Sequence, residues 1–148
     1  MNTIKVQQEI IAELLRNPER HECYHHASPS GEHFIMPDRA RGFFIPDEEM
    51  MLDAKRLKPL TRVPVSAPLF FDESTRLKAT GEYRKRGVTM AVGYKGEHGE
   101  TWVDTTLLGY FSRTAEYHQS GKNQPVWVVE QVSTTAKRPV GVIMPMNI

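Results

Sequence analysis

The chain has 148 residues, of which 39% are hydrophobic and 25% charged, and its formal net charge is +1. This composition is typical of one globular domain and excludes a disordered or fibrous chain, and no apolar run approaches the roughly 18 residues of a membrane span. The N-terminus lacks a basic region followed by an apolar run, so no secretory signal is expected, and one cysteine, Cys23, forbids an intrachain disulfide. We therefore expect a cytoplasmic protein.

The charge is distributed unevenly along the chain. Residues 1–54 carry 5 basic and 10 acidic side chains, residues 55–95 carry 10 and 3, and residues 96–148 carry 4 and 5. The three parts thus have net charges of −5, +7 and −1, and the middle third is a basic block that the mean charge conceals.

The first part of the chain predicts a helix and then an antiparallel meander. Asn2 or Thr3 can cap a helix that runs to about Arg16. Its predicted apolar face consists of Ile4, Ile11, Leu14 and Leu15, widened by Val6 and Ile10. Strands are predicted at 22–27, 33–37 and 43–46, separated by turn sequences. Acidic residues 47–49 then favour the start of a short helix with Met50, Met51 and Leu52 as its apolar residues.

A proline-rich segment, residues 58–75, is predicted to be an extended connector. After it, residues 78–90 predict a basic strand, the glycines of 93–99 a turn, and residues 101–103 a further strand. Asp104 can cap a second short helix with Leu107, Leu108 and Phe111 on its apolar face. The last strands are predicted at 115–119, 125–131 and 139–146.

These elements predict an α+β fold: an antiparallel sheet, one N-terminal helix and two short helices. The strands that end near Ile45 and Val103 are both followed by an acidic cap and an apolar helical turn. The single domain, residues 1–148, can therefore be divided into two similar halves, 1–57 and 76–148, joined by the connector.

One cluster has the residue types of a metal site: His21, Cys23, His25, His26 and His33. On a strand, His21, Cys23 and His25 share one face, and His33 can approach across the hairpin. Their spacing matches no standard zinc pattern, which favours an exposed strand with a buried thiol. We expect no metal and no cofactor, and a metal-dependent enzyme that uses the cluster is an alternative.

No catalytic motif is found in the chain. The carboxylates between Asp47 and Asp53 lie where a helix start favours negative charge, and no nucleophile elbow, phosphate loop or dinucleotide fingerprint is present. We predict a non-enzymatic protein with no catalytic residues.

The basic block contains the candidate DNA-binding residues. These are Arg76, Lys78, Arg84, Lys85 and Arg86, the last three directly following Tyr83. Such a surface can neutralise several phosphates, and its binding would weaken steeply with salt. The alternative is a solvated strand face without a ligand.

Residues 103–148 resemble the last part of a bacterial sliding clamp, the DNA polymerase III beta subunit. The resemblance rests on a strand that enters a Leu-Leu-x-x-Phe helix at 103–111, and on a strand, a turn and a Pro-Val strand at 115–129. It also rests on the terminus Val142-Ile143-Met144-Pro145-Met146-Asn147-Ile148, where the family typically ends in Val-Met-Pro-Met-Arg-Leu. Asn147 replaces the usual arginine.

The resemblance implies a clamp-like unit that binds DNA and a protein partner, for example one related to replication. In the family the Met-Pro-Met region borders a cleft for short peptides, so Met144, Pro145 and Met146 are the expected partner-binding residues. The chain has room for one of the three clamp domains, so a ring would require a homo-oligomer. A compact chain of this kind also suggests a phage or mobile element. The alternative is an interaction adaptor or inhibitor without DNA contact.

Overall fold

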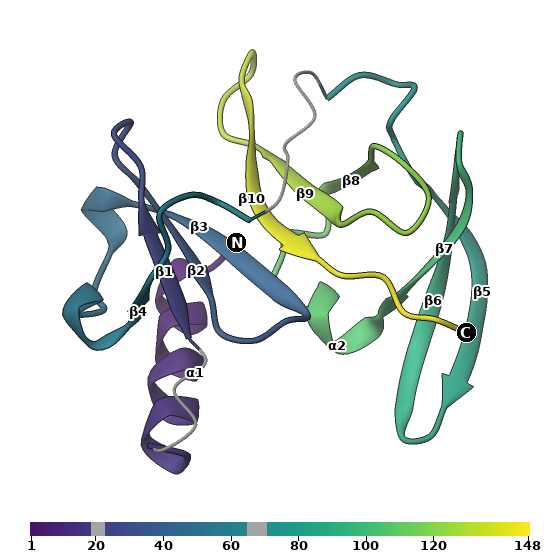
Figure 1. Cartoon of the computed structure of the whole chain (residues 1–148). Helices are drawn as coiled ribbons and strands as arrows, with labels where there is room; N and C mark the ends of the chain where they lie inside the picture. Colours follow the sequence, from purple (N-terminus) through teal and green to yellow (C-terminus); the bar gives the residue numbers. More distant parts are fainter. Residues whose placement is uncertain (19–22, 65–70) are drawn as a thin grey trace.

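The computed structural model describes residues 1–18, 23–64 and 71–148. Within these residues the chain forms a helix, ten strands in two sheets, and three short helical segments (Figure 1). The predicted α+β class is confirmed. No helix in the described part of the chain is long and apolar enough to cross a membrane. His21 and residues 65–70 of the predicted connector lie outside the described residues.

The larger sheet has seven strands in the order β4-β1-β2-β3-β10-β9-β8. Their bounds are β1 Tyr24–Ala27, β2 Glu32–Met36, β3 Arg41–Pro46, β4 Lys58–Pro59, β8 Glu116–Gln119, β9 Val126–Gln131 and β10 Lys137–Ile143. All neighbouring pairs are antiparallel except β1 with β4, so the predicted meander β1-β2-β3 is confirmed. At the centre of the sheet, β3 pairs with β10, with Phe43 opposite Gly141.

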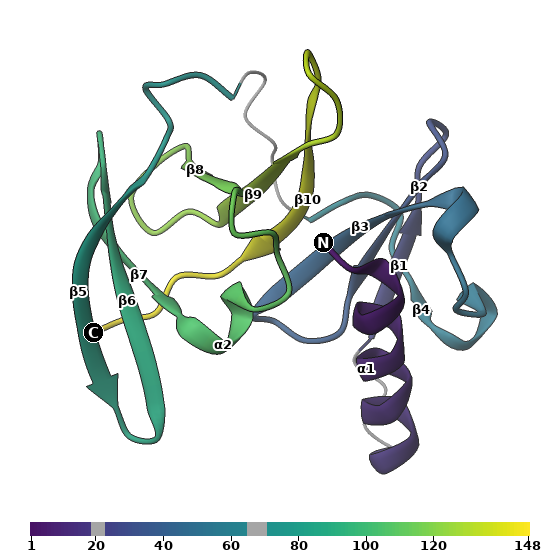
Figure 2. The same ribbon diagram turned by 180° about the vertical axis from the view of Figure 1, so that it is seen from behind.

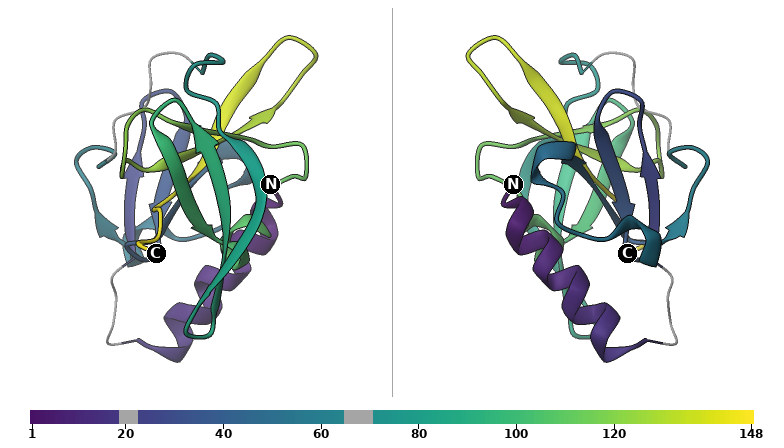
Figure 3. Two further views of the ribbon diagram at one scale, coloured as in Figure 1. Left: turned by 90° about the vertical axis from the view of Figure 1, so that its right-hand side faces the viewer. Right: turned by 90° about the vertical axis from the view of Figure 1, so that its left-hand side faces the viewer.

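The smaller sheet has three antiparallel strands in the order β5-β6-β7. They are β5 Lys78–Arg86, β6 Thr89–Gly96 and β7 Gly99–Asp104. This sheet stands at one side of the molecule, and the C-terminus ends beside it (Figures 1 and 2). The opposite side carries the helix and the β1–β2 hairpin, and the loop between β9 and β10 projects from the body (Figure 3).

The helix α1, Thr3–Arg16, begins as predicted, with the Asn2 side chain accepting a hydrogen bond from the Lys5 amide. Its buried face differs from the predicted one. Thr3, Val6, Gln7 and Ile10 are buried, whereas Ile4, Ile11 and Leu15 are exposed. The buried face is centred on Gln7 because the amide group of that side chain bonds four backbone groups.

Two short helices follow β3 and β7 as predicted, and a third was not predicted. The first, η1 Asp47–Glu49, is a single 3-10 turn that ends before the apolar residues 50–52, so the prediction that these belong to the helix is wrong. The additional 3-10 turn is η2, Ala54–Arg56. The second predicted helix is α2, Thr105–Leu108, whose Thr106 amide donates to the Asp104 carboxylate.

The basic segment 78–90 is a hairpin rather than the single strand predicted from the sequence. The chain turns at Gly87, which adopts a φ of 61°, and Gly93 and Gly96 lie within β6 rather than in a turn. Gly93 is needed in the strand because a Cβ there would lie 3.0 Å from the Trp102 ring. The turn that was predicted over residues 93–99 therefore consists of Glu97 and His98, between the ends of β6 and β7.

The main core lies between the two sheets and under α1. It joins Val6 and Ile10 of the helix to Ile45, Val103 and Ile143 of the strands. A smaller cluster on the other side of the larger sheet contains Phe34, Phe44, Trp127 and Val142. The main core draws residues from both ends of the chain and from both sheets, which fixes the smaller sheet and its basic hairpin against the larger one.

Candidate nucleic-acid interface

The β5–β6 hairpin, residues 78–96, forms an exposed edge of the smaller sheet. Among the described strands β5 pairs with β6 alone, and eight of its nine residues are exposed, Thr80 being half-buried. The turn reaches past α2 to one end of the molecule, and Val88 at the turn is fully exposed (Figures 1 and 2). Residues 76–96 contain six basic side chains and one acidic one, Glu82, for a net charge of +5.

The strand register assigns the hairpin side chains to two faces. Ala79, Tyr83 and Lys85 lie opposite Tyr94, Val92 and Met90, respectively. Directly opposed residues share a face, so these six side chains lie on the face whose Val92 and Tyr94 enter the main core. We call this the core-side face. Arg84 and Arg86, opposite Ala91 and Thr89, lie on the other face.

The two arginines of that other face are held in place. The Arg84 guanidinium lies 4.4 Å from the centroid of the Trp102 ring, a cation–π contact over a buried tryptophan. Arg86 donates a hydrogen bond to the backbone carbonyl of Asn147. Neither contact neutralises a charge, so both guanidiniums keep their attraction for phosphate.

The candidate residues differ in their ion pairs. Among the described residues, Lys78, Arg84, Lys85 and Arg86 take part in no ion pair, and neither does Lys95, which lies opposite Lys78. Arg76 instead lies 3.3 Å from a Glu73 carboxylate oxygen and 3.7 Å from Glu116. The structure thus brings Arg84, Lys85 and Arg86 together near the turn and places Arg76 and Lys78 at the other end of the strand.

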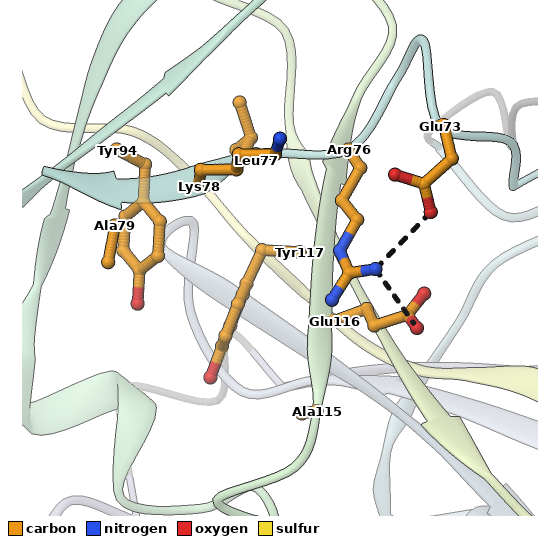
Figure 4. A pocket seen from close by; sticks show the side chains of 9 residues that line it. All are labelled: Glu73, Arg76, Leu77, Lys78, Ala79, Tyr94, Ala115, Glu116 and Tyr117. Carbon is orange, nitrogen blue, oxygen red and sulfur yellow. Dashed lines mark hydrogen bonds and ion pairs between the residues drawn. The ribbon is translucent and has the colours of Figure 1, made fainter.

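A cleft opens at that other end, between β5, β6 and β8 (Figure 4). Its volume is about 550 Å³, and its lining residues are Glu73, Arg76, Leu77, Lys78, Ala79, Tyr94, Ala115, Glu116 and Tyr117. The rings of Tyr94 and Tyr117 are tilted against each other with centroids 5.2 Å apart. No sequence pattern indicates this cleft, because Tyr94 and Tyr117 occupy ordinary strand positions on separate sheets.

The charges of the cleft are partly balanced. The Lys137 ammonium, 2.7 Å from Glu116, is the main cause of the lowered pKa of that carboxyl, with His118 and Arg76 adding to it. Burial raises the pKa of Tyr117, and the neighbouring Tyr94 adds to the shift. Glu116 is therefore ionised and Tyr117 keeps its hydroxyl proton at neutral pH. The cleft offers cations, an acceptor, donors and aromatic rings side by side.

The C-terminal segment with Met144, Pro145 and Met146 bridges the two sheets. The Met144 amide donates to the Ala40 carbonyl and the Met146 amide to the Trp102 carbonyl, each at 2.8 Å. Met144 is 37% exposed, and Pro145 and Met146 are half-buried. The cleft beside β5 and two smaller pockets beside α1 are lined by other side chains.

Within the described part of the histidine cluster, His25 and His33 form a hydrogen-bonded chain with Asp47. His25 Nε2 lies 2.7 Å from His33 Nδ1, and His33 Nε2 lies 2.7 Å from the Asp47 carboxylate. Cys23 is buried in the main core, where burial raises the pKa of its thiol to about 11. His26 bonds the Leu60 carbonyl instead. No group of three or more His, Cys, Asp or Glu residues that could hold a metal is found within residues 1–18, 23–64 and 71–148.

Comparison with protein-family models, with curated proteins and with solved structures found no match for this chain. The resemblance of residues 103–148 to the bacterial sliding clamp therefore stays a prediction from the sequence. The function of the hairpin and its neighbouring cleft is inferred from their own geometry and charge.

Proposed function

We propose that this protein is a nucleic-acid-binding protein without enzymatic activity, and that the β5–β6 hairpin is its binding element. The observation that carries the proposal is the set of five basic side chains on this exposed hairpin, none of which forms an ion pair with a described residue. Phosphate contacts of Lys and Arg supply most of the affinity in sequence-independent binding.

The alternative of a merely solvated strand is less consistent with the composition of the hairpin. A solvated strand usually mixes both signs of charge, whereas residues 76–96 carry one carboxylate against six cations. The hairpin also exposes Tyr83, Val88 and Met90, apolar or aromatic side chains that gain by contact with bases. The sliding-clamp resemblance supports a DNA-related function on independent grounds.

The first test reverses one charge on the hairpin. We expect Lys85→Glu to weaken binding to a fluorescein-labelled DNA oligonucleotide about tenfold at low salt, as measured by fluorescence anisotropy. Lys85 is exposed and takes part in no ion pair among the described residues, so the substitution leaves the fold intact. The matched control is Lys5→Glu on α1, also exposed, which makes the same charge change on another element. Equal weakening by both variants, or no DNA binding by the wild type, contradicts the proposal.

A second candidate function is binding of a protein partner at Met144, Pro145 and Met146. It is favoured by the exposure of Met144 and Ile148, at 37% and 46%, on a segment whose backbone is already fixed. A labelled peptide of the kind that binds sliding clamps should then bind the wild type more tightly than Met144→Asp. If the peptide binds while DNA does not, the protein is an adaptor rather than a nucleic-acid-binding protein.

A further inference from the structure

The cleft and the hairpin lie along the same face of the smaller sheet. Ala79 and Tyr94, which line the cleft, belong to the core-side face, and so do Tyr83 and Lys85 nearer the turn. Tyr83 is 64% exposed. An aromatic cleft, an exposed tyrosine and a lysine without an ion pair among the described residues therefore follow one another along β5.

A cleft, a tyrosine and a lysine in a row along one strand are not what binding to a duplex requires. A duplex presents phosphates and groove edges and keeps the faces of its bases stacked, so an exposed aromatic ring gains little from it. Single strands offer their base faces, and proteins that bind them combine a basic track with aromatic stacking platforms. In the hairpin, Lys78 at the rim of the cleft and Lys85 nearer the turn can contact the backbone phosphates while Tyr83 offers a ring face.

The cleft also has the chemistry to hold one unstacked nucleotide. Its volume of about 550 Å³ lies in the range of small-molecule sites. The Glu116 carboxylate can accept a hydrogen bond from an N–H group of a base, such as the ring N3–H of thymine, and Lys78 at the rim can contact a phosphate. Arg76, held between Glu73 and Glu116 in Figure 4, is fixed in position and adds little net charge, which suits a polar, uncharged base better than a second phosphate.

We infer that the nucleic acid is single-stranded, that it runs along the core-side face from the Tyr94–Tyr117 cleft past Tyr83 to Lys85, and that one base enters the cleft. This inference rests on the proposed function and narrows it. Binding to a duplex, or binding in which no base stacks on Tyr83, would agree with the proposed function but would contradict this inference.

The experiment compares an oligothymidylate of about 15 nucleotides with a duplex of equal length, by fluorescence anisotropy at matched salt. We expect the wild type to prefer the single strand, and Tyr83→Leu to reduce single-strand affinity about tenfold while duplex affinity changes less than about twofold. Tyr83→Phe keeps the ring and should bind as the wild type does. Ala79→Leu, which fills the mouth of the cleft from an exposed position, should also weaken only single-strand binding.

The results distinguish failure of the inference from failure of the proposed function. If the wild type binds neither probe at low salt, the proposed function is wrong. If it binds both equally and Tyr83→Leu and Ala79→Leu change neither affinity, the nucleic acid does not follow this face and the single-strand inference is overturned, while the binding role of the basic hairpin stands.

Discussion

At the scale of single residues, a hydrogen-bonded chain runs from His25 through His33 to Asp47. With His33 Nε2–H donating to the Asp47 carboxylate, His33 Nδ1 accepts from His25 Nε2–H. The residue types of this cluster are those of metal ligands, although their spacing matches no standard zinc pattern. The side-chain directions that make the chain of bonds depend on the β1–β2 register, which sequence spacing does not contain.

The titration of His25 has a defined direction. Burial, and then the charge of His33, lower the pKa of His25 below its usual 6.5. The unfolded chain therefore binds this proton more readily than the folded one, so the stability that His25 contributes is complete above about pH 6.5 and is lost as the pH falls through the lowered folded pKa.

His25→Gln keeps an amide donor for His33 but cannot titrate. We expect urea unfolding of the wild type to show falling stability from about pH 7 to pH 5, and His25→Gln to flatten that decline. His98→Gln, in the exposed β6–β7 turn, serves as the control and should decline as the wild type does. A wild-type profile that is flat over this range is the contrary result.

At the scale of elements, Gln7 joins α1 to the segment after β3. Its side-chain amide nitrogen donates to the Thr3 and Glu49 carbonyls at 3.0 and 2.9 Å. Its oxygen accepts from the amides of Met51 and Leu52 at 2.6 and 3.1 Å. Gln7 is 1% exposed, so its side chain rather than water supplies the hydrogen bonds of these backbone groups. Hydrophobic periodicity could not identify a buried glutamine as the centre of the helix face.

Gln7→Leu preserves the approximate size and helix propensity of this side chain but removes the bonds. We expect the free energy of unfolding to fall by about 1–3 kcal/mol, because partly buried amides and a carbonyl of the 49–52 segment lose their partner. Gln8→Leu, one position along on the exposed side of α1, should change it by less than about 0.5 kcal/mol. Similar effects of the two variants in urea denaturation would mean that the Gln7 bonds contribute little.

The elements that could be predicted well from the sequence are those marked by a capping residue or a turn sequence. α1 has its Asn2 cap, the β1–β2 turn has its Ser-Pro-Ser-Gly sequence, and α2 has Asp104. The β5–β6 turn could not be predicted in this way because Arg86-Gly87-Val88 lies in a run of charged and β-branched residues, which is typical of a continuous strand. Only the positive φ of Gly87 permits the reversal there.

At the scale of the whole molecule, strands that are distant in sequence meet in one sheet. β3 near the N-terminus pairs with β10 near the C-terminus, and the C-terminal segment then crosses to β7 and to Arg86. The basic residues could be predicted as a group from composition. The cleft beside them could not be predicted from the sequence. It forms where β8 of the larger sheet lies against the start of β5 in the smaller sheet, and this contact joins residues that are far apart in the chain.

The central claim, that the basic hairpin binds nucleic acid through its phosphates, is tested most directly by the salt dependence of binding. Five basic residues of the hairpin form no ion pair among the described residues, so a plot of log affinity against log salt for a single-stranded oligonucleotide should have a slope between about −2 and −4. Lys85→Glu should make that slope shallower by about one. A slope near zero, or no binding at low salt, would contradict the claim.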